Sequence, residues 1–222
     1  MAGGGLGWAV VALVGANLAD PAPEFAAYLI GIGGSGLLTL ALWSTRRWWL
    51  PRLSGRHARR NAIGLGVAGA ATVETLFLIG QHATGAEGIA ADPNLGADLL
   101  ITMPWYAGMV WLFVRAQDRR RWPAATVLLL GALYELGADG LIGGVTGGTW
   151  ANPLAALALL ALVAFWQFLI VYSPMLLPAA WVVGTMPPRE PPAGPAWRDA
   201  LLPLAWLGPY ALWALVLVLL AA

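Results

Sequence analysis

Two carboxylates lie within an apolar stretch that has the length of a membrane-spanning helix. Glu135 and Asp139 fall in residues 124–144, AATVLLLGALYELGADGLIGG, which carry no other charge. Because they are four residues apart, they share one face of a helix. An acidic side chain inside a bilayer costs about 3 kcal/mol on insertion scales. We therefore expect this face to point into the protein and away from lipid.

A third acid, Glu74, lies inside the apolar segment 61–82, and Asp98 opens the segment 98–115. Carboxylates that are buried and close together favour the protonated form, because charge is costly in a medium of low dielectric constant. A protonated acid beside an ionised one can act as a general acid and general base pair. The buried acids are therefore the first candidates for chemistry in this chain.

Composition predicts the class of protein that must position these acids. The 222 residues are 59% hydrophobic and 10% charged, whereas soluble domains carry about 25% charged residues. The sequence therefore predicts one integral-membrane domain over residues 1–222, built as an all-α polytopic helical bundle. With no Cys and a net charge of +1, neither a disulfide nor a nucleic-acid partner is expected.

Apolar segments predict six membrane spans, or seven if residues 6–19 also cross. The six are 24–44, 61–82, 98–115, 124–144, 152–184 and 200–221. Residues 6–19 are short for a span, so a short first helix, a signal peptide and an interfacial segment all stay open. Residues 152–184 exceed the roughly 20 residues that one span needs. Either Ser173-Pro174 and Pro178 kink the helix there, or the span tilts and its end lies along the interface.

Arginine supplies every basic residue except two His, and its distribution predicts the topology. All 12 Arg lie in or beside three segments, 45–60, 115–122 and 185–199. Because cytoplasmic loops are enriched in basic residues, we expect these segments on the cytoplasmic side of a bacterial inner membrane. The six Arg of 45–60 could also bind anionic lipid headgroups.

The segment 98–115 contains Pro104, followed by Trp105 and Tyr106. A proline within a helix frees a backbone carbonyl and bends the helix, which opens room beside it. A metal site is not predicted, because the chain has only His57 and His82 and no HxxxH or ExxH spacing. No cofactor is predicted.

Residues 24–184 resemble the EXPERA-type fold of emopamil-binding protein and the sigma-2 receptor. In that family a deep Glu lies on the second span, and a second acid begins the third span, which then contains a Pro. The fourth span carries another acid, and the fifth carries a buried amide. The matching positions are Glu74 in GAATVETLFLI, Asp98 and Pro104 in ADLLITMPWY, Asp139 in YELGADGL and Gln167 in FWQFLIVYSPMLLP.

The resemblance implies a five-helix core over 24–184, with 200–221 as an additional C-terminal span. It also implies a lipid-accessible cavity for a sterol-like or isoprenoid ligand, with Glu74 and Asp98 as the catalytic or amine-binding pair. The family includes sterol double-bond isomerases, in which two acids shuttle protons and an aromatic residue stabilises the cation. Ala70 and Ile170 stand where the isomerases have His and Trp, which leaves the activity less certain than the fold.

Further ligand-binding residues are expected around that pair. They are Asp139, Gln167, Glu135, Trp105, Tyr106 and Trp166. An aromatic face near a cation attracts it, so Trp166 or Trp105 could replace the missing Trp. Glu135 has no counterpart in the family pattern, and its role stays open.

Two other functions remain as alternatives. A small proton-coupled transporter would use Glu74, Glu135 and Asp139 as a relay, although the inner halves of these spans are nearly all apolar. A structural or assembly subunit of a membrane complex would use the acids only to bond helices together. A homodimer is also left open.

Overall fold

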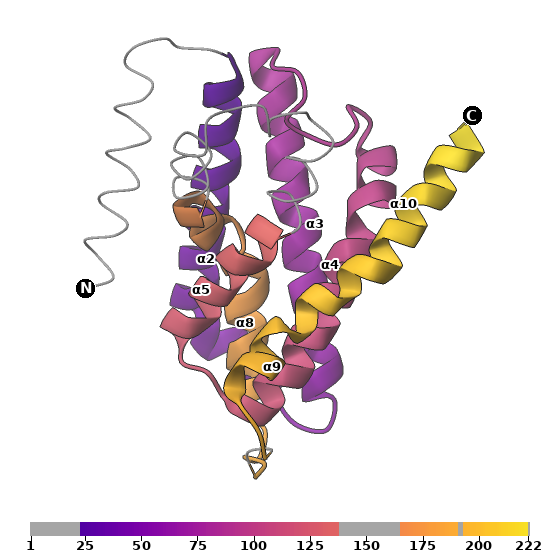
Figure 1. Ribbon diagram of the computed structural model, residues 1–222. Coiled ribbons are helices and arrows are strands. Elements are labelled where there is room, and N and C mark those ends of the chain that lie inside the picture. The colour runs from indigo at the N-terminus through magenta and orange to yellow at the C-terminus, as the bar shows by residue number, and fades with distance from the viewer. Residues whose placement is uncertain (1–22, 138–164, 191–192, 222) are drawn as a thin grey trace.

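The computed structural model describes residues 23–137, 165–190 and 193–221, and in them every regular element is a helix (Figure 1). This confirms the predicted all-α class. The predicted segment 6–19 and the site residue Asp139 lie outside the described residues, as do large parts of the predicted spans 124–144 and 152–184.

Three long helices stand side by side (Figure 1). They are α2 (Pro23–Leu53), α3 (Ala58–Thr84) and α4 (Leu95–Arg120), and α3 packs against both of the others. A fourth helical run consists of α9 (Ala196–Leu201), η3 (Leu202–Trp206) and α10 (Leu207–Ala221). It crosses α4 obliquely, and the end of α10 leaves the bundle (Figure 1).

Shorter helices complete the bundle. α5 (Ala124–Glu135) packs on α8 (Ser173–Gly184), and α8 also contacts α2, α3 and α4. A short helix, Phe165–Val171, precedes α8 and meets it at an angle of 56°. The predicted break at Ser173-Pro174 is therefore confirmed, whereas Pro178 lies within α8 without ending it.

In the described part of the chain, four helices are long and apolar enough to cross a membrane, or five if the bent pair counts as one span. Many large apolar side chains on them are exposed, among them Leu37 and Leu40 on α2 and Leu219 on α10. Such surfaces suit lipid better than water. These helices indicate an integral membrane protein, and the predicted six or seven spans stay a prediction.

The turns at the arginine-bearing end are shorter than the sequence suggested. Residues 45–53, expected in a loop, continue α2, and α3 already begins at Ala58. Arg and Leu are good helix formers, so a basic segment need not be a loop. α4 likewise continues through Arg120, and Arg121, with φ 53°, ends it.

Two prolines free backbone carbonyls, and side chains bind both of them. Pro104 has no N–H for the carbonyl of Leu100, which instead accepts from Trp213 Nε1 at 3.1 Å. Pro174 likewise leaves the carbonyl of Ile170, which accepts from Ser173 Oγ at 2.6 Å. The first bond fastens α10 to α4, and the second stabilises the break before α8.

Close backbone contact holds α3 against α8. A Cβ added at Gly69 would lie 2.6 Å from the carbonyl oxygen of Pro174, a separation that real Cβ atoms do not reach. Glycine is therefore required for this approach, as small residues are in many membrane helix pairs. Earlier on α3, a Cβ added at Gly64 would have nothing within 4 Å.

Candidate functional site

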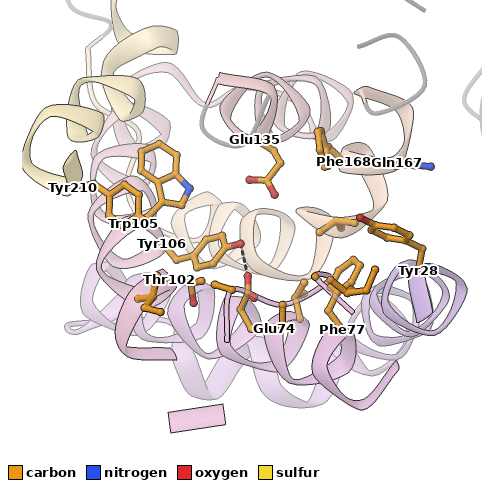
Figure 2. A pocket seen from close by; sticks show the side chains of 17 residues that line it. Tyr28, Glu74, Phe77, Thr102, Trp105, Tyr106, Glu135, Gln167, Phe168 and Tyr210 are labelled. Carbon is orange, nitrogen blue, oxygen red and sulfur yellow. Dashed lines mark hydrogen bonds between the residues drawn. The ribbon is translucent and has the colours of Figure 1, made fainter. Parts of the chain in front are cut away.

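A cavity of about 520 Å³ lies between α3, α4, α5, α10 and the segment before α8 (Figure 2). Ligand cavities commonly have volumes of about 300–1,000 Å³. Its described lining holds two carboxylates among aromatic and apolar side chains and contains no Arg or His. The lining residues are Tyr28, Val73, Glu74, Phe77, Gly88, Ile89, Ala90, Ala91, Ile101, Thr102, Trp105, Tyr106, Glu135, Gln167, Phe168, Val171 and Tyr210.

Glu74 enters the cavity from α3. Its side chain is nearly buried, and Tyr106 of α4 donates its hydroxyl to Oε1 of Glu74 (Figure 2). Tyr106 follows Pro104 by two residues on the same helix. The predicted deep acid and the predicted aromatic neighbour are thus brought together.

Glu135 enters from the opposite side, at the last residue of α5, and its carboxylate points toward Tyr106 and Glu74 (Figure 2). Tyr172, at the break before α8, donates its hydroxyl to Oε2 of Glu135. Trp105 Nε1 in turn donates to the Tyr172 hydroxyl at 3.3 Å. Each carboxylate therefore accepts from a buried phenol.

The two phenols connect the two halves of the site. The ring centroids of Tyr106 and Tyr172 are 6.0 Å apart, with an interplanar angle of 56°. Both residues are at least 95% buried. Glu74 and Glu135 thus face one space from opposite walls (Figure 2), and Tyr172 bonds to Glu135 from outside the lining.

Aromatic rings form the ends of the cavity. Tyr28 and Phe77 meet edge to face with centroids 6.1 Å apart, and Trp105 packs beside Tyr210 at 6.0 Å. Such faces bind apolar groups and attract cations. The combination of apolar walls and central carboxylates suits a hydrophobic molecule with one positively charged or hydrogen-bond-donating group.

Asp98 does not line the cavity. Its side chain is fully buried, and its Oδ1 accepts from the backbone N–H groups of Ala91 at 2.9 Å and Asp92 at 3.4 Å. Its Oδ2 has no hydrogen-bond partner in the described part of the chain. The catalytic role expected for Asp98 stays a prediction, and its observed contacts hold a loop.

That loop closes one side of the cavity. Gln81 of α3 accepts from the N–H groups of Ile89 at 3.0 Å and Ala90 at 2.9 Å. Gln81 and Asp98 together therefore fix the segment 89–92, and residues 89–91 of it belong to the cavity lining. Sequence reasoning gave Gln81 no role, because an amide at the end of a span looks like an ordinary interfacial residue.

The remaining predicted site residues lie near the bent pair or outside the described chain. Gln167 lines the cavity, but its amide points away from the two carboxylates (Figure 2). Trp166 is not part of the lining and meets Phe165 edge to face at 6.1 Å. Asp139 cannot be placed relative to Glu135, since residue 139 is not described.

Tyr172 is a residue of the candidate site that the sequence did not predict. The signal was present, because a tyrosine in the apolar run FLIVYSP needs a partner for its hydroxyl when buried. The identity of that partner was not readable, since Glu135 is 37 residues away.

Comparisons with known proteins do not assign the chain to a family. No protein-family model matches it, and no curated protein or solved structure matches it either. The fold and the site therefore define the class by themselves: a helical protein with membrane-length apolar helices and an internal acidic cavity.

Proposed function

We propose that the chain is an integral membrane protein whose acidic cavity binds a hydrophobic small molecule of the sterol-like or isoprenoid class. The observation that carries the proposal is the pair of acid–phenol contacts, Glu74–Tyr106 and Glu135–Tyr172, on facing walls of a mostly apolar cavity. The pattern-level resemblance to the EXPERA-type family supports the same ligand class.

The proposed reaction is the movement of a carbon–carbon double bond. One protonated carboxylic acid donates its proton to an alkene carbon, and the opposite carboxylate removes a proton from the carbon next to the resulting cation. The double bond moves by one position, the two carboxyl groups exchange protonation states, and no co-reactant is consumed. Aromatic faces such as those of Trp105 and Tyr210 stabilise the intermediate cation.

Glu74 and Glu135 are the acid and base in this proposal, and Asp98 is a positioning residue. Both glutamates line the cavity, whereas Asp98 binds the backbone of the neighbouring loop. The phenols orient the carboxylates by hydrogen bonds, and such preorganised donors stabilise negative charge on the carboxylate oxygens.

The apolar core between the cavity and the arginine-bearing end disfavours the transporter alternative. Beyond Tyr106, α4 buries Met109, Val110, Phe113 and Val114 completely, and no ionisable side chain interrupts them before Arg115. A proton path across the membrane needs polar groups or water at every step. The described helices offer that path only in one half of the bundle.

A binding experiment tests the proposal with dimethyldodecylamine, a hydrophobic tertiary amine, and dodecanol as the uncharged control. The thermal midpoint of the detergent-purified protein is measured with each compound for wild type, Glu74→Gln, Glu135→Gln and Glu87→Gln. Glu87 is an exposed acid outside the cavity, so it controls for loss of charge alone. We expect the amine to stabilise wild type and Glu87→Gln but neither cavity variant.

Two results would contradict binding at this cavity: equal stabilisation by dodecanol, or unchanged amine stabilisation in both cavity variants.

Turnover needs a separate test. A Δ8 sterol and a cyclic isoprenoid alkene are each incubated with the protein in D2O, and the recovered lipid is analysed by mass spectrometry. Deuterium incorporation that is lost in Glu74→Gln and Glu135→Gln supports isomerisation, and its absence leaves the protein as a binding protein.

The orientation is proposed from the arginines, with segments 45–60 and 115–122 on the cytoplasmic side of a bacterial inner membrane. The chain has no Cys, so single cysteines report the side directly. We expect a membrane-impermeant maleimide to label Glu87→Cys in intact cells and to leave His57→Cys, an exposed position in the arginine-bearing turn, unlabelled until the cells are broken. Labelling in the reverse pattern would invert the topology.

A further inference from the structure

A second cavity, of about 380 Å³, opens among the arginines at the other end of the bundle. It lies between the end of α2, the junction of α4 with α5, and the last turns of α8. Its lining residues are Arg46, Leu50, Gln117, Arg121, Trp122, Ala124, Leu177, Ala180, Trp181, Gly184 and Thr185.

The lining combines a basic part with an apolar part. Arg46 and Arg121 supply two guanidinium groups, and no acidic residue belongs to the lining. Leu50, Leu177 and Ala180 supply apolar surface beside them. A ligand with an anionic head and a hydrocarbon chain matches both parts at once.

The two guanidinium groups have different freedom to move. Arg121 is fixed, because it donates to Val183 O, to Pro187 O at 3.0 Å and to Asp118 Oδ1 at 3.3 Å. Arg46 lies 4.6 Å above the ring centroid of Trp43 and donates to that residue's carbonyl at 2.7 Å. Both contacts of Arg46 are local, so its remaining donors can turn toward a bound anion.

Ion pairs at this end leave an excess of positive charge. Asp118 pairs with Arg59, Arg121 and Arg189, so one carboxylate faces three guanidinium groups. Several further arginines of the same end make no ion pair in the described part of the chain: Arg46, Arg47, Arg52, Arg56 and Arg60. The cavity therefore opens into a region of positive potential, which attracts anions.

We propose that this second cavity binds an anionic phospholipid, with its phosphate between Arg46 and Arg121 and an acyl chain along Leu50, Leu177 and Ala180. A phosphate with an acyl chain is the occupant that fits both the charge and the apolar surface, and anionic lipids accumulate at juxtamembrane arginines. The site is separate from the acidic cavity and does not depend on the function proposed for it.

The test uses the full chain purified in a mild, uncharged detergent. We measure its thermal midpoint with dioleoyl phosphatidylglycerol and with dioleoyl phosphatidylcholine. Native mass spectrometry counts the bound lipid molecules in each case. Arg46→Gln removes the mobile guanidinium, and Arg47→Gln is the matched control, because Arg47 is the exposed neighbour outside the lining. We expect Arg46→Gln to weaken phosphatidylglycerol binding about fivefold and Arg47→Gln to change it little.

A second variant tests the cavity itself. Gly184 lines it, and a Cβ at this position meets nothing within 4 Å. Gly184→Leu should fill the space without disturbing the lipid-free thermal midpoint, and it should abolish the stabilisation by phosphatidylglycerol. Gly64→Leu, at an equally open position on α3, should leave that stabilisation intact.

Four results would overturn the proposal. One is equal stabilisation by the two lipids, and another is an equal loss of binding in Arg46→Gln and Arg47→Gln, which would indicate diffuse surface charge. The third is stabilisation by glycerol 1-phosphate alone that matches the lipid, because the occupant would then be a free phosphate. Retained lipid stabilisation in Gly184→Leu would also exclude this cavity.

Discussion

The two ends of the bundle bury the same kind of side chain with different partners. At the arginine-bearing end, Asp118 and Asp199 pair with guanidinium groups, including an Arg120 Nε to Asp199 Oδ2 contact of 2.6 Å. In the acidic cavity, Glu74 and Glu135 accept from the phenols of Tyr106 and Tyr172. The acids at one end thus have charged partners, and the acids in the cavity have neutral ones.

Partner chemistry explains this division. A guanidinium stays charged at any physiological pH and fixes its carboxylate in the ionised state. A phenol is a neutral donor, and it can remain bonded to a carboxyl group in either protonation state. Phenol partners are therefore compatible with the acid and base roles proposed for Glu74 and Glu135.

The largest effect is expected when the ion-paired acid loses its charge. Asp118→Asn leaves three arginines around a neutral side chain that is only 1% exposed. We expect a loss of about 3 kcal/mol in the free energy of unfolding, because three charge-assisted contacts are weakened at once while the arginines, which are 23–57% exposed, keep part of their hydration. Denaturation in mixed micelles measures it, with the exposed Glu87→Gln as control. Equal stability of the two variants would remove the distinction between the ends.

A smaller loss is expected at the close contact between α3 and α8. Gly69→Ala places a methyl group 2.6 Å from the carbonyl oxygen of Pro174. Overpacking of this kind costs about 2 kcal/mol, and the same assay measures it. Gly64→Ala on the same helix meets nothing within 4 Å, so a loss as large in that control would show that helix propensity, and not the contact with α8, is responsible.

Replacing an acid of the cavity should lower the free energy of unfolding less than replacing Asp118. Glu74→Gln and Glu135→Gln keep an acceptor oxygen for the phenol, so we expect each to change the free energy of unfolding by about 1 kcal/mol or less. The measurement is the same denaturation series, compared directly with Asp118→Asn. A loss in either glutamine variant as large as that of Asp118→Asn would mean that the cavity acids also serve the fold.

The sequence predicted the parts of this arrangement that depend on local composition. The length of the apolar segments predicted the helical class, and the Ser173-Pro174 pair predicted the break before α8. The arginine-bearing segments, which were expected on one side, meet at one end through Asp118 and Asp199. Glu74, Trp105 and Tyr106 were expected near a cavity, and all three line it. Each of these follows from hydropathy, charge or the missing N–H of proline.

The pairing of side chains from distant segments was beyond that reasoning. Asp98 was paired with Glu74 on the family pattern, but its place in the first turn of α4 gives it the N–H groups of the preceding loop as partners. Glu135 was expected near the ligand with its role left open, and the bend before α8 gives it Tyr172 as a partner. Helix rotation and tilt decide such contacts, and one sequence does not specify them.

The smallest effect is expected outside both groups of acids, where α10 meets α4. Trp213→Phe removes the N–H that donates to the carbonyl of Leu100, which Pro104 leaves without a helical partner. Because this contact is exposed, water or lipid headgroups can replace part of it, and we expect a loss of about 0.5 kcal/mol in the free energy of unfolding.

Combining Trp213→Phe with Pro104→Ala isolates the bond, since the alanine N–H restores the helical donor. If the bond fixes α10, Trp213→Phe should cost less in the Pro104→Ala background than in wild type, and an equal cost would mean that Trp213 contributes only by packing.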